Sequence, residues 1–181
     1  MRNLQRVRLL ALLFWLVTAI SVAAVNTFYD RQQTLTLIAD AGLTVDDSQF
    51  HLQSLQHAPN DGVITVTALI HRDSVTSKNM MGDEVISPTK LMRAFTQVGA
   101  VQALLADAST NKTVKVLHEF THMKGFKLRA ESTDEDHIHL QVSISDKFII
   151  DRHTWFTYQG VALAGESVLA KFEWMGVIYR E

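Results

Sequence analysis

Residues 87–108 read SPTKLMRAFTQVGAVQALLADA, and this stretch predicts the main helix of the chain. Ser87 is a suitable N-terminal cap, and Pro88 suits the first helical turn because no backbone amide donor is needed there. Apolar residues then recur at helical spacing, at Leu91, Phe95, Val98, Val101 and Leu105. We expect this apolar stripe to pack against a β-sheet.

Strands are predicted on both sides of this helix. Residues 62–72 precede it and alternate so that Ile64, Val66, Ala68 and Ile70 share one face. The same alternation after the helix predicts strands over 112–122, 126–132, 137–145, 153–163 and 167–179, with a glycine turn at 123–125. Residues 73–86 read as a loop with Met80 and Met81 at its centre. The predicted fold class is α+β, with an antiparallel β-sheet packed against one main α-helix.

The N-terminus, MRNLQRVRLLALLFWLVTAISVAAV, places Arg2, Arg6 and Arg8 before an uncharged apolar run. A helix over residues 9–28 would be about 30 Å long, at about 1.5 Å per residue, and could cross a membrane. The positive-inside rule would then place the N-terminus in the cytoplasm. The alternatives are a cleaved secretory signal, because Val22-Ala23-Ala24 offers small residues for cleavage, and a buried helix of a soluble protein. The anchor and the cleaved signal both predict export of the rest of the chain.

This N-terminal interpretation sets the predicted domain organisation. Residues 1–8 form a short cytoplasmic tail, 9–28 a single transmembrane signal anchor, and 29–47 a membrane-proximal linker or helix. Within this region residues 26–42 are expected to be helical up to Gly42, with a strand over 34–39 as the alternative. Residues 48–181 form the extracytoplasmic domain. The predicted location is the bacterial inner membrane, with this domain in the periplasm.

Composition narrows the classes of function. The formal net charge of −2 provides no basic surface for nucleic acid, so no nucleic-acid partner is predicted. The chain has no cysteine, so it has neither a disulfide framework nor a cysteine nucleophile. An exported domain without disulfides is compatible with a bacterial periplasm.

One motif could carry chemistry. His118-Glu119-Phe120-Thr121-His122 matches H-E-x-x-H, in which two histidines on one helical face bind zinc and the glutamate acts as general base. His118 and His122 are therefore the candidate metal ligands, with a third ligand expected from Glu131, Asp136, His137 or His139. The competing interpretation is a strand, because residues 114–122 alternate. On a strand the two histidines would lie about 13 Å apart, too far to share an ion.

Other polar residues are arranged less suggestively. His137 and His139 fall on the polar face of their predicted strand, where a solvated surface is the simplest interpretation. Asp146, Asp151 and His153 are acid–base residue types close together in sequence, but nothing in their spacing predicts a catalytic triad. No cofactor is predicted from these residues.

The function predicted from these features is that of a non-enzymatic, single-pass inner-membrane protein. Its periplasmic domain would bind other envelope proteins, as an accessory subunit of a secretion or pilus assembly or as a stabilising partner of a membrane-bound regulator. The lipid bilayer, contacted through residues 9–28, is the other predicted partner. The alternatives are a membrane-anchored zinc metallohydrolase that uses His118 and His122, and a periplasmic small-molecule-binding module.

Overall fold

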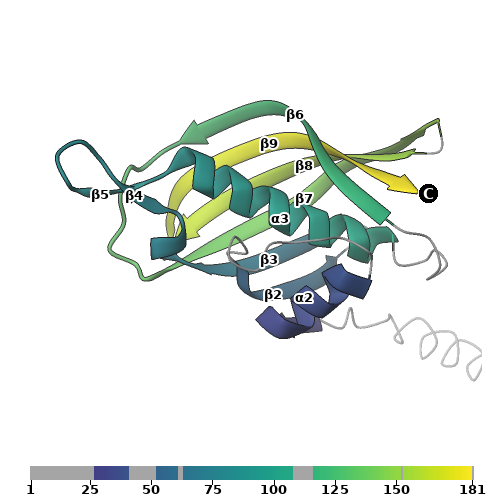
Figure 1. Ribbon diagram of the computed structural model, residues 1–181, viewed down its shortest axis with the longest axis horizontal. Helices are drawn as coiled ribbons and strands as arrows, with labels where there is room; N and C mark the ends of the chain where they lie inside the picture. The colour runs from purple at the N-terminus through teal and green to yellow at the C-terminus, as the bar shows by residue number, and fades with distance from the viewer. Residues whose placement is uncertain (1–26, 41–51, 61–62, 108–115, 152, 181) are drawn as a thin grey trace, which may run out of the picture.

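The computed structural model describes residues 27–40, 52–60, 63–107, 116–151 and 153–180 (Figure 1). The helices are α2 (Arg31–Asp40), α3 (Pro88–Asp107) and the short 3-10 helix η2 (Arg72–Ser74). The strands are β1 (Thr27–Asp30), β2 (Leu52–Asn60), β3 (Val63–His71), β4 (Thr76–Lys78), β5 (Glu84–Ile86), β6 (Val116–Leu128), β7 (His137–Ile150), β8 (His153–Ala164) and β9 (Ser167–Arg180).

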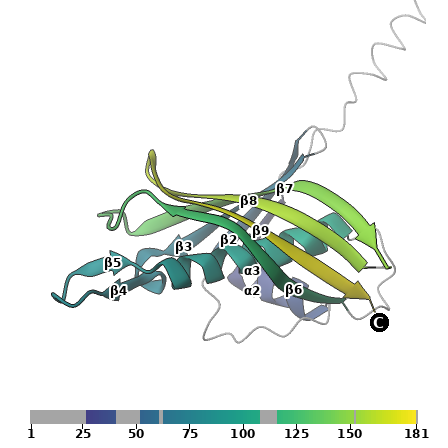
Figure 2. The same cartoon turned by 90° about the horizontal axis from the view of Figure 1, so that it is seen from above.

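Seven of the described strands form one antiparallel sheet in the order β1-β2-β3-β7-β8-β9-β6. The chain leaves the sheet after β3, forms the separate β4–β5 ribbon, and crosses one face of the sheet as α3. It re-enters at the far edge as β6 and then returns to the middle of the sheet as β7. The curved sheet therefore has α3 lying along its inner face, with α2 beside it in front of β2 (Figures 1 and 2).

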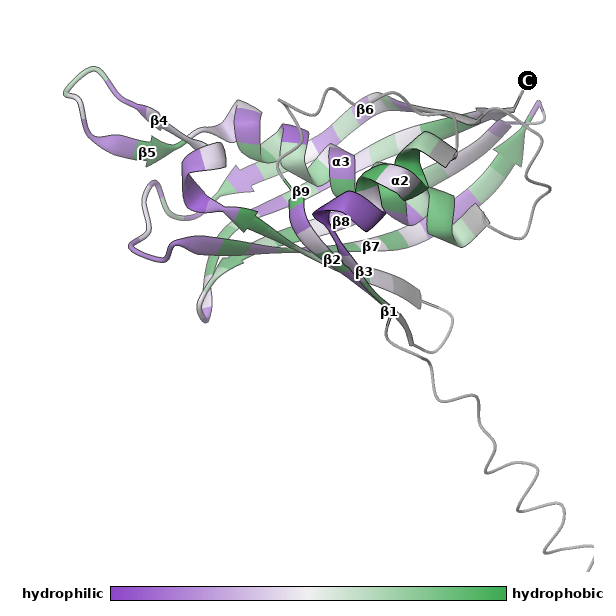
Figure 3. Ribbon diagram, turned by 60° about the horizontal axis from the view of Figure 1, so that its bottom comes forward, coloured by the Kyte–Doolittle hydropathy of each residue, from purple (hydrophilic) through white to green (hydrophobic). Residues whose placement is uncertain are grey.

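Helix α3 confirms the helix predicted over 87–108. The Ser87 hydroxyl accepts a hydrogen bond from the Lys90 backbone amide at 3.5 Å, and Pro88 occupies the first helical position. The predicted apolar stripe faces the sheet and is fully buried at Leu91, Phe95, Val98 and Val101. The alternation of hydrophobic and hydrophilic residues that predicted the strands is visible along the sheet in Figure 3.

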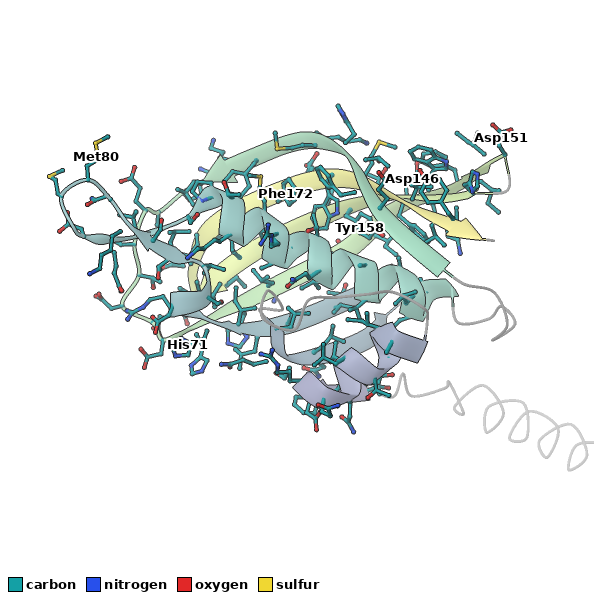
Figure 4. The ribbon with its side chains drawn as sticks, viewed as in Figure 1. His71, Met80, Asp146, Asp151, Tyr158 and Phe172 are labelled. Carbon is teal, nitrogen blue, oxygen red and sulfur yellow. The ribbon has the colours of Figure 1, made fainter. Side chains whose placement is uncertain are left out.

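Aromatic rings fill the layer between α3 and the sheet. Trp174 lies in the middle of this layer, stacked on Tyr158 at a centroid distance of 4.9 Å and on Phe172 at 4.6 Å. Phe95 of α3 packs against the same group, 5.7 Å from Phe172. Figure 4 shows Tyr158 and Phe172 behind α3. This aromatic layer is the centre of the hydrophobic core.

The region around α2 differs from the prediction. Residues 27–30 form β1, which pairs with β2, and the helix then runs over residues 31–40. Asp30 and Gln33 form a reciprocal cap: the Gln33 amide donates to Asp30 Oδ1 at 2.7 Å, and the Asp30 amide donates to Gln33 Oε1 at 2.9 Å. The cap starts the helix despite its β-branched residues, so the alternative strand over 34–39 is wrong.

Strand β6 replaces two predicted strands and the turn between them. The pairing of β6 with β9 shifts between Phe120 and His122 and again between Met123 and Gly125. Each shift absorbs an extra residue as a bulge, so Gly125 continues the strand instead of turning the chain. The prediction of a turn at 123–125 is therefore wrong.

Residues 73–86 are also more ordered than the predicted loop. They contain part of η2 and the β4–β5 ribbon. At the tip of the ribbon, the Asn79 Oδ1 accepts hydrogen bonds from the backbone amides of Met81 and Asp83, both at 2.9 Å. Met80 and Met81 are exposed at this tip, and the ribbon projects beyond the sheet at one end of the molecule (Figure 1).

The predicted fold class needs correction. The described residues contain two α-helices on the sheet instead of one main helix, and none of the described helices is long and apolar enough to cross a membrane. Of the predicted transmembrane segment over 9–28, only Thr27 and Phe28 are described, and they belong to β1. The rest of that segment, the tail over 1–8 and the boundary at 47/48 lie outside the described residues.

Candidate functional site

The H-E-x-x-H motif lies on strand β6, where the geometry of a helical zinc site is absent. His118 pairs with Ile178 of β9 and His122 pairs with Met175, two positions on opposite faces of β9. At about 3.3 Å per residue the two histidine positions are about 13 Å apart. Within the part of the chain that the structure describes, no group of three or more His, Cys, Asp or Glu residues could hold a metal ion. The metal assignment of His118 and His122 stays a prediction, and the strand geometry argues against it.

The candidate third ligands are also remote from the motif. Glu131 and Asp136 lie on the connection between β6 and β7, while His137 and His139 lie on β7. Strands β8 and β9 separate β7 from β6, which corresponds to about 14 Å at the usual spacing of about 4.8 Å between strands. His137 instead meets His71 of β3, with ring centroids 5.5 Å apart on the exposed face of the sheet.

The sequence neighbours Asp146, Asp151 and His153 do not converge on one another either. Asp146 accepts the Lys147 amide at 2.9 Å, and Asp151 occupies the β7–β8 turn with a positive φ of 49°. Figure 4 shows Asp151 at the tip of this hairpin and His71 at the opposite end of the molecule. Of these three residues, only His153 takes part in a cluster of acid–base side chains.

That cluster joins Glu119, His153 and Tyr179 on the outer face of the sheet. Glu119 comes from β6, Tyr179 from β9 and His153 from β8, three strands that lie side by side. The rings of His153 and Tyr179 meet edge-on, with centroids 4.8 Å apart. The Tyr179 hydroxyl donates a hydrogen bond to the Glu119 carboxylate. We refer to these three residues as the acid–base cluster.

The surroundings of Tyr179 keep its hydroxyl protonated. Partial loss of hydration raises the pKa of Tyr179 above its ordinary value of 10.0, and the charge and hydrogen bond of Glu119 raise it further. Tyr179 carries its hydroxyl proton at neutral pH already at its ordinary pKa, and it donates its hydrogen bond to the adjacent Glu119 side chain. A donor and an acceptor placed side by side are the components of proton-transfer chemistry.

Two aromatic residues border the acid–base cluster on the β7–β8 hairpin. Phe148 and Trp155 stack nearly parallel, with centroids 6.3 Å apart and an interplanar angle of 5°. The Nε1 of Trp155 and the Nδ1 of His153 are buried and make no hydrogen bond to the described residues. Buried nitrogen atoms normally have a hydrogen-bond partner, so two without one, on residues two positions apart on β8, are unusual.

The inner face of β6 carries apolar side chains next to the position of Glu119 on its outer face. Phe120 and Met123 remain 43 % and 49 % exposed, although Phe120 stacks on Phe172 at 6.5 Å. Phe126 contacts the same Phe172 ring edge-on at 5.8 Å. The free edge of β6 therefore combines two exposed apolar side chains, Phe120 and Met123, on one face with the Glu119 carboxylate on the other.

Local sequence patterns do not predict this cluster. The H-E-x-x-H motif indicates Glu119 as a general base beside two zinc ligands, and His153 is an acid–base residue type without a predicted partner. Tyr179 is distant in sequence, and only the pairing of β6 with β9 brings it to Glu119. No local signal encodes that pairing.

Comparisons with known proteins identify the fold. No protein-family model matches the chain, and no curated protein matches its sequence. The dehydratase domain from the CurJ module of the Curacin polyketide synthase superposes with a TM-score of 0.56 at 14% identity, covering 90% of this chain and 53% of that domain. The protein yhdA from Lactococcus lactis, named as a candidate thioesterase, superposes with a TM-score of 0.51 at 8% identity, covering 76% of this chain and 99% of that one. These similarities establish a hotdog fold, in which a curved antiparallel sheet wraps a long helix.

These findings correct the functional predictions. The prediction of a non-enzymatic, single-pass inner-membrane accessory protein is wrong, because the described residues form a fold shared with proteins named as enzymes. The predicted partners (the bilayer and envelope proteins) and the predicted inner-membrane location depended on the same interpretation and are withdrawn with it. The hydropathy of the N-terminal run carries no information about the fold of the residues that follow it.

Proposed function

We propose that this chain is an enzyme that acts on an acyl thioester, with Glu119 transferring a proton and Tyr179 donating a hydrogen bond at the free edge of β6. The observation that carries the proposal is the hotdog architecture, shared with a protein named as a candidate thioesterase and with a polyketide synthase dehydratase domain. Because a fold can host many functions, the assignment depends on the residues available at the site.

The acid–base cluster supplies the groups that thioester hydrolysis requires. The Glu119 carboxylate accepts a proton from a water molecule as the water oxygen attacks the thioester carbonyl carbon. Tyr179 has a single hydroxyl proton, so in this step its hydroxyl turns from the Glu119 carboxylate and donates a hydrogen bond to the oxygen that becomes negatively charged. The carbon–sulfur bond then breaks, and the thiolate takes the proton that Glu119 accepted. The products are a carboxylic acid and a thiol.

The exposed Phe120 and Met123, on the inner face of the edge strand, suit the acyl part of such a substrate, which reaches them around the free edge of β6 from the outer face. Phe120 is adjacent to Glu119 in sequence and lies on the other face of the same edge strand. An acyl chain against Phe120 and Met123 would cover two side chains that are about half exposed and would gain the usual hydrophobic free energy of burial.

The test is thiol release from a series of acyl-coenzyme A thioesters of increasing chain length, measured with the full-length protein. We expect activity that Glu119→Gln lowers by about 10²-fold or more, because the isosteric amide cannot accept the proton. Tyr179→Phe keeps the ring and is expected to lower kcat more than it raises KM, because the lost hydrogen bond strengthens only in the transition state.

The control is Glu173→Gln, which removes an exposed carboxylate from the outer face of β9 away from Tyr179. It should leave thiol release unchanged. Equal losses in Glu119→Gln and Glu173→Gln would exclude the assigned role of Glu119, and absence of thiol release across the series would exclude thioester hydrolysis.

A further inference from the structure

Two histidines face each other where β3 meets β7, at the end of the molecule away from the acid–base cluster (Figure 4). His71 is the last residue of β3 and His137 is the first residue of β7, and the two positions are directly opposite in the antiparallel pairing. The Arg72 amide donates to the Asp136 carbonyl at 2.9 Å, so the backbone contact continues one residue past the histidines. The two strands therefore hold these side chains at a fixed separation.

The spacing of the two imidazole rings suits a shared metal ion. The ring centroids lie 5.5 Å apart at an interplanar angle of 80°. Two imidazoles that bind one ion with metal–nitrogen distances of about 2.1 Å and a near-tetrahedral angle have centroids about 5 Å apart. The His71 side chain is 43 % exposed and His137 is exposed, so both rings can turn to direct a nitrogen at the ion.

Asp73 provides the outer contact that a metal-binding histidine normally has. Its Oδ2 lies 3.5 Å from the Nδ1 of His71, and its backbone amide donates to the same nitrogen at 3.3 Å. When the Nε2 of His71 binds an ion, the ring proton is on Nδ1 and donates to the Asp73 carboxylate, while water accepts the exposed Asp73 amide. The carboxylate thereby fixes the ring tautomer and makes Nε2 a stronger ligand.

The positive charge next to the histidine pair is offset by oxygen atoms. Arg72 follows His71 in sequence, and its Nη1 donates to the Thr133 carbonyl at 3.2 Å. Its guanidinium also lies 3.7 Å from the Asp73 carboxylate and 4.0 Å from the Glu84 carboxylate. These two carboxylates reduce the repulsion that Arg72 would exert on a bound cation.

We infer that His71 and His137 form a binding site for a divalent transition ion of the zinc and copper(II) class, which imidazole ligands prefer. The Nε2 of His71 and one ring nitrogen of His137 are the protein ligands. Water fills the other coordination positions, because the residues that the structure describes provide no cluster of three ligands. Two protein ligands bind the ion reversibly, with a dissociation constant in the micromolar range, so dialysis removes it. This inference does not depend on the proposed enzymatic activity.

An ion at this position joins the two halves of the sheet. β3 ends the β1-β2-β3 half and β7 begins the β7-β8-β9-β6 half, and the β3–β7 pairing is the contact between them. A ligand that binds only the folded chain raises the free energy of unfolding as its concentration rises. We therefore expect zinc to stabilise the sheet through this pair of histidines.

Calorimetric titration of the full-length protein, without an affinity tag, with zinc chloride at neutral pH measures the site. His71→Asn and His137→Asn should each raise the zinc dissociation constant by about tenfold or more, because each removes one of two ligands. Asparagine at position 71 keeps an oxygen that can cap η2, and His137 is exposed, so both variants should fold. Circular dichroism verifies this.

His139→Asn is the matched control. His139 lies on the same face of β7, two positions after His137, but it is opposite Leu69 and not opposite a second histidine. This variant should bind zinc as the natural protein does. Zinc should also raise the Tm of the natural protein and of His139→Asn, but not that of His71→Asn or His137→Asn.

Electron paramagnetic resonance with one equivalent of copper(II) sulfate tests the coordination directly. We expect splitting from two imidazole nitrogens in the natural protein and from one fewer in His137→Asn. Asp73→Asn should keep the two-nitrogen signal while raising the dissociation constant, because Asp73 positions His71 and does not bind the ion.

The results that would overturn the inference are distinct from those that exclude the enzyme. Absence of zinc binding up to millimolar concentration excludes the site. Binding that His71→Asn and His137→Asn leave unchanged, or that His139→Asn weakens equally, excludes this pair as the ligands. None of these outcomes bears on thiol release, which involves the other end of the sheet.

Discussion

Two glycines allow the aromatic layer to pack as closely as it does. A Cβ atom at Gly160 would lie 2.7 Å from the Phe95 ring and 3.0 Å from the Trp174 ring, and one at Gly99 would lie 2.8 Å from Trp174. Both rings are fully buried. We expect Gly160→Ala to lower the free energy of unfolding by about 1–3 kcal/mol, as overpacking of a filled core does.

Gly99→Ala should cost less than Gly160→Ala, because alanine in a helix interior recovers about 1 kcal/mol of helix propensity. Gly125→Ala is the control, since no atom lies within 4 Å of the added Cβ there. Urea unfolding of the three variants at one protein concentration measures the differences. A Gly160→Ala protein as stable as Gly125→Ala would show that the layer is less tightly packed than described.

Burial of Tyr158 predicts a stability that depends on alkaline pH. Burial raises the pKa of Tyr158 far above its ordinary value of 10.0. Below pH 10 both folded and unfolded chains keep the phenol proton, so Tyr158 contributes no pH dependence. Above pH 10 the unfolded chain loses the proton while the folded chain keeps it. The free energy of unfolding should then fall by about 1.4 kcal/mol per pH unit from this residue.

The measurement is urea unfolding between pH 9 and about pH 11, compared with Tyr158→Phe. The variant should show a flatter fall above pH 10, because it has no phenol at this position to ionise. The same slope in both proteins would mean that another group causes the alkaline loss of stability.

His118 and His122 show why a short motif is weak without its secondary structure. The sequence matches the zinc signature, but the strand places the two positions opposite different faces of β9. We therefore expect the purified protein to contain much less than one zinc ion per chain by atomic emission, with no difference between the natural protein and His118→Ala. Stoichiometric zinc that His118→Ala removes would restore the metal site and require a different conformation of β6.

At the scale of elements, local sequence patterns predicted the helix and the strands whose position depends on capping residues and on hydrophobic periodicity. The Ser87-Pro88 start and the 3.6-residue period located α3 to within one residue, and alternation located β3, β8 and β9 nearly as well. The failures occurred where tertiary pairing overrides local preference. Gly125 resembles a turn residue in isolation, but two bulges keep it within β6 because the strand must follow the twisted edge of β9.

The β4–β5 ribbon tests whether one side chain can order an element. Its strands have three residues each and depend on Asn79, whose Oδ1 accepts the Met81 and Asp83 amides. Replacement by alanine removes both hydrogen bonds, at about 1 kcal/mol each. We expect Asn79→Ala to speed amide hydrogen exchange at Met81 and Asp83 by about tenfold or more, with little change in exchange within β8. Unchanged exchange at the tip would show that the backbone bonds alone hold the ribbon.

The topology of the whole molecule does not follow from local sequence patterns. The strands predicted after the helix over 87–108 succeed one another along the chain, yet the first of them, β6, lies beyond β9 at the far edge of the sheet and not beside β7. Strand order depends on which edges remain free after the helix has packed, and no local signal records that. The acid–base cluster cannot be predicted from local patterns either, because only the β6–β9 pairing places Glu119 next to Tyr179.

This topology predicts slow folding. The β2–β3 hairpin and the β7–β8–β9 meander are local in sequence, but the sheet becomes continuous only when Val66 of β3 meets Val142 of β7. The β6–β9 pairing is similarly non-local, and the chain between β3 and β7 must place α3 on the inner face before either pairing is complete. Closing these long loops costs entropy before the contacts form, so we expect refolding in milliseconds to seconds.

Stopped-flow refolding from urea, followed by tryptophan fluorescence, measures the rate. Val142→Ala at the junction should slow refolding more than Ala162→Gly within the meander, relative to the stability that each one loses, if joining the two halves limits the rate. Equal ratios would mean that the halves meet after the rate-limiting step.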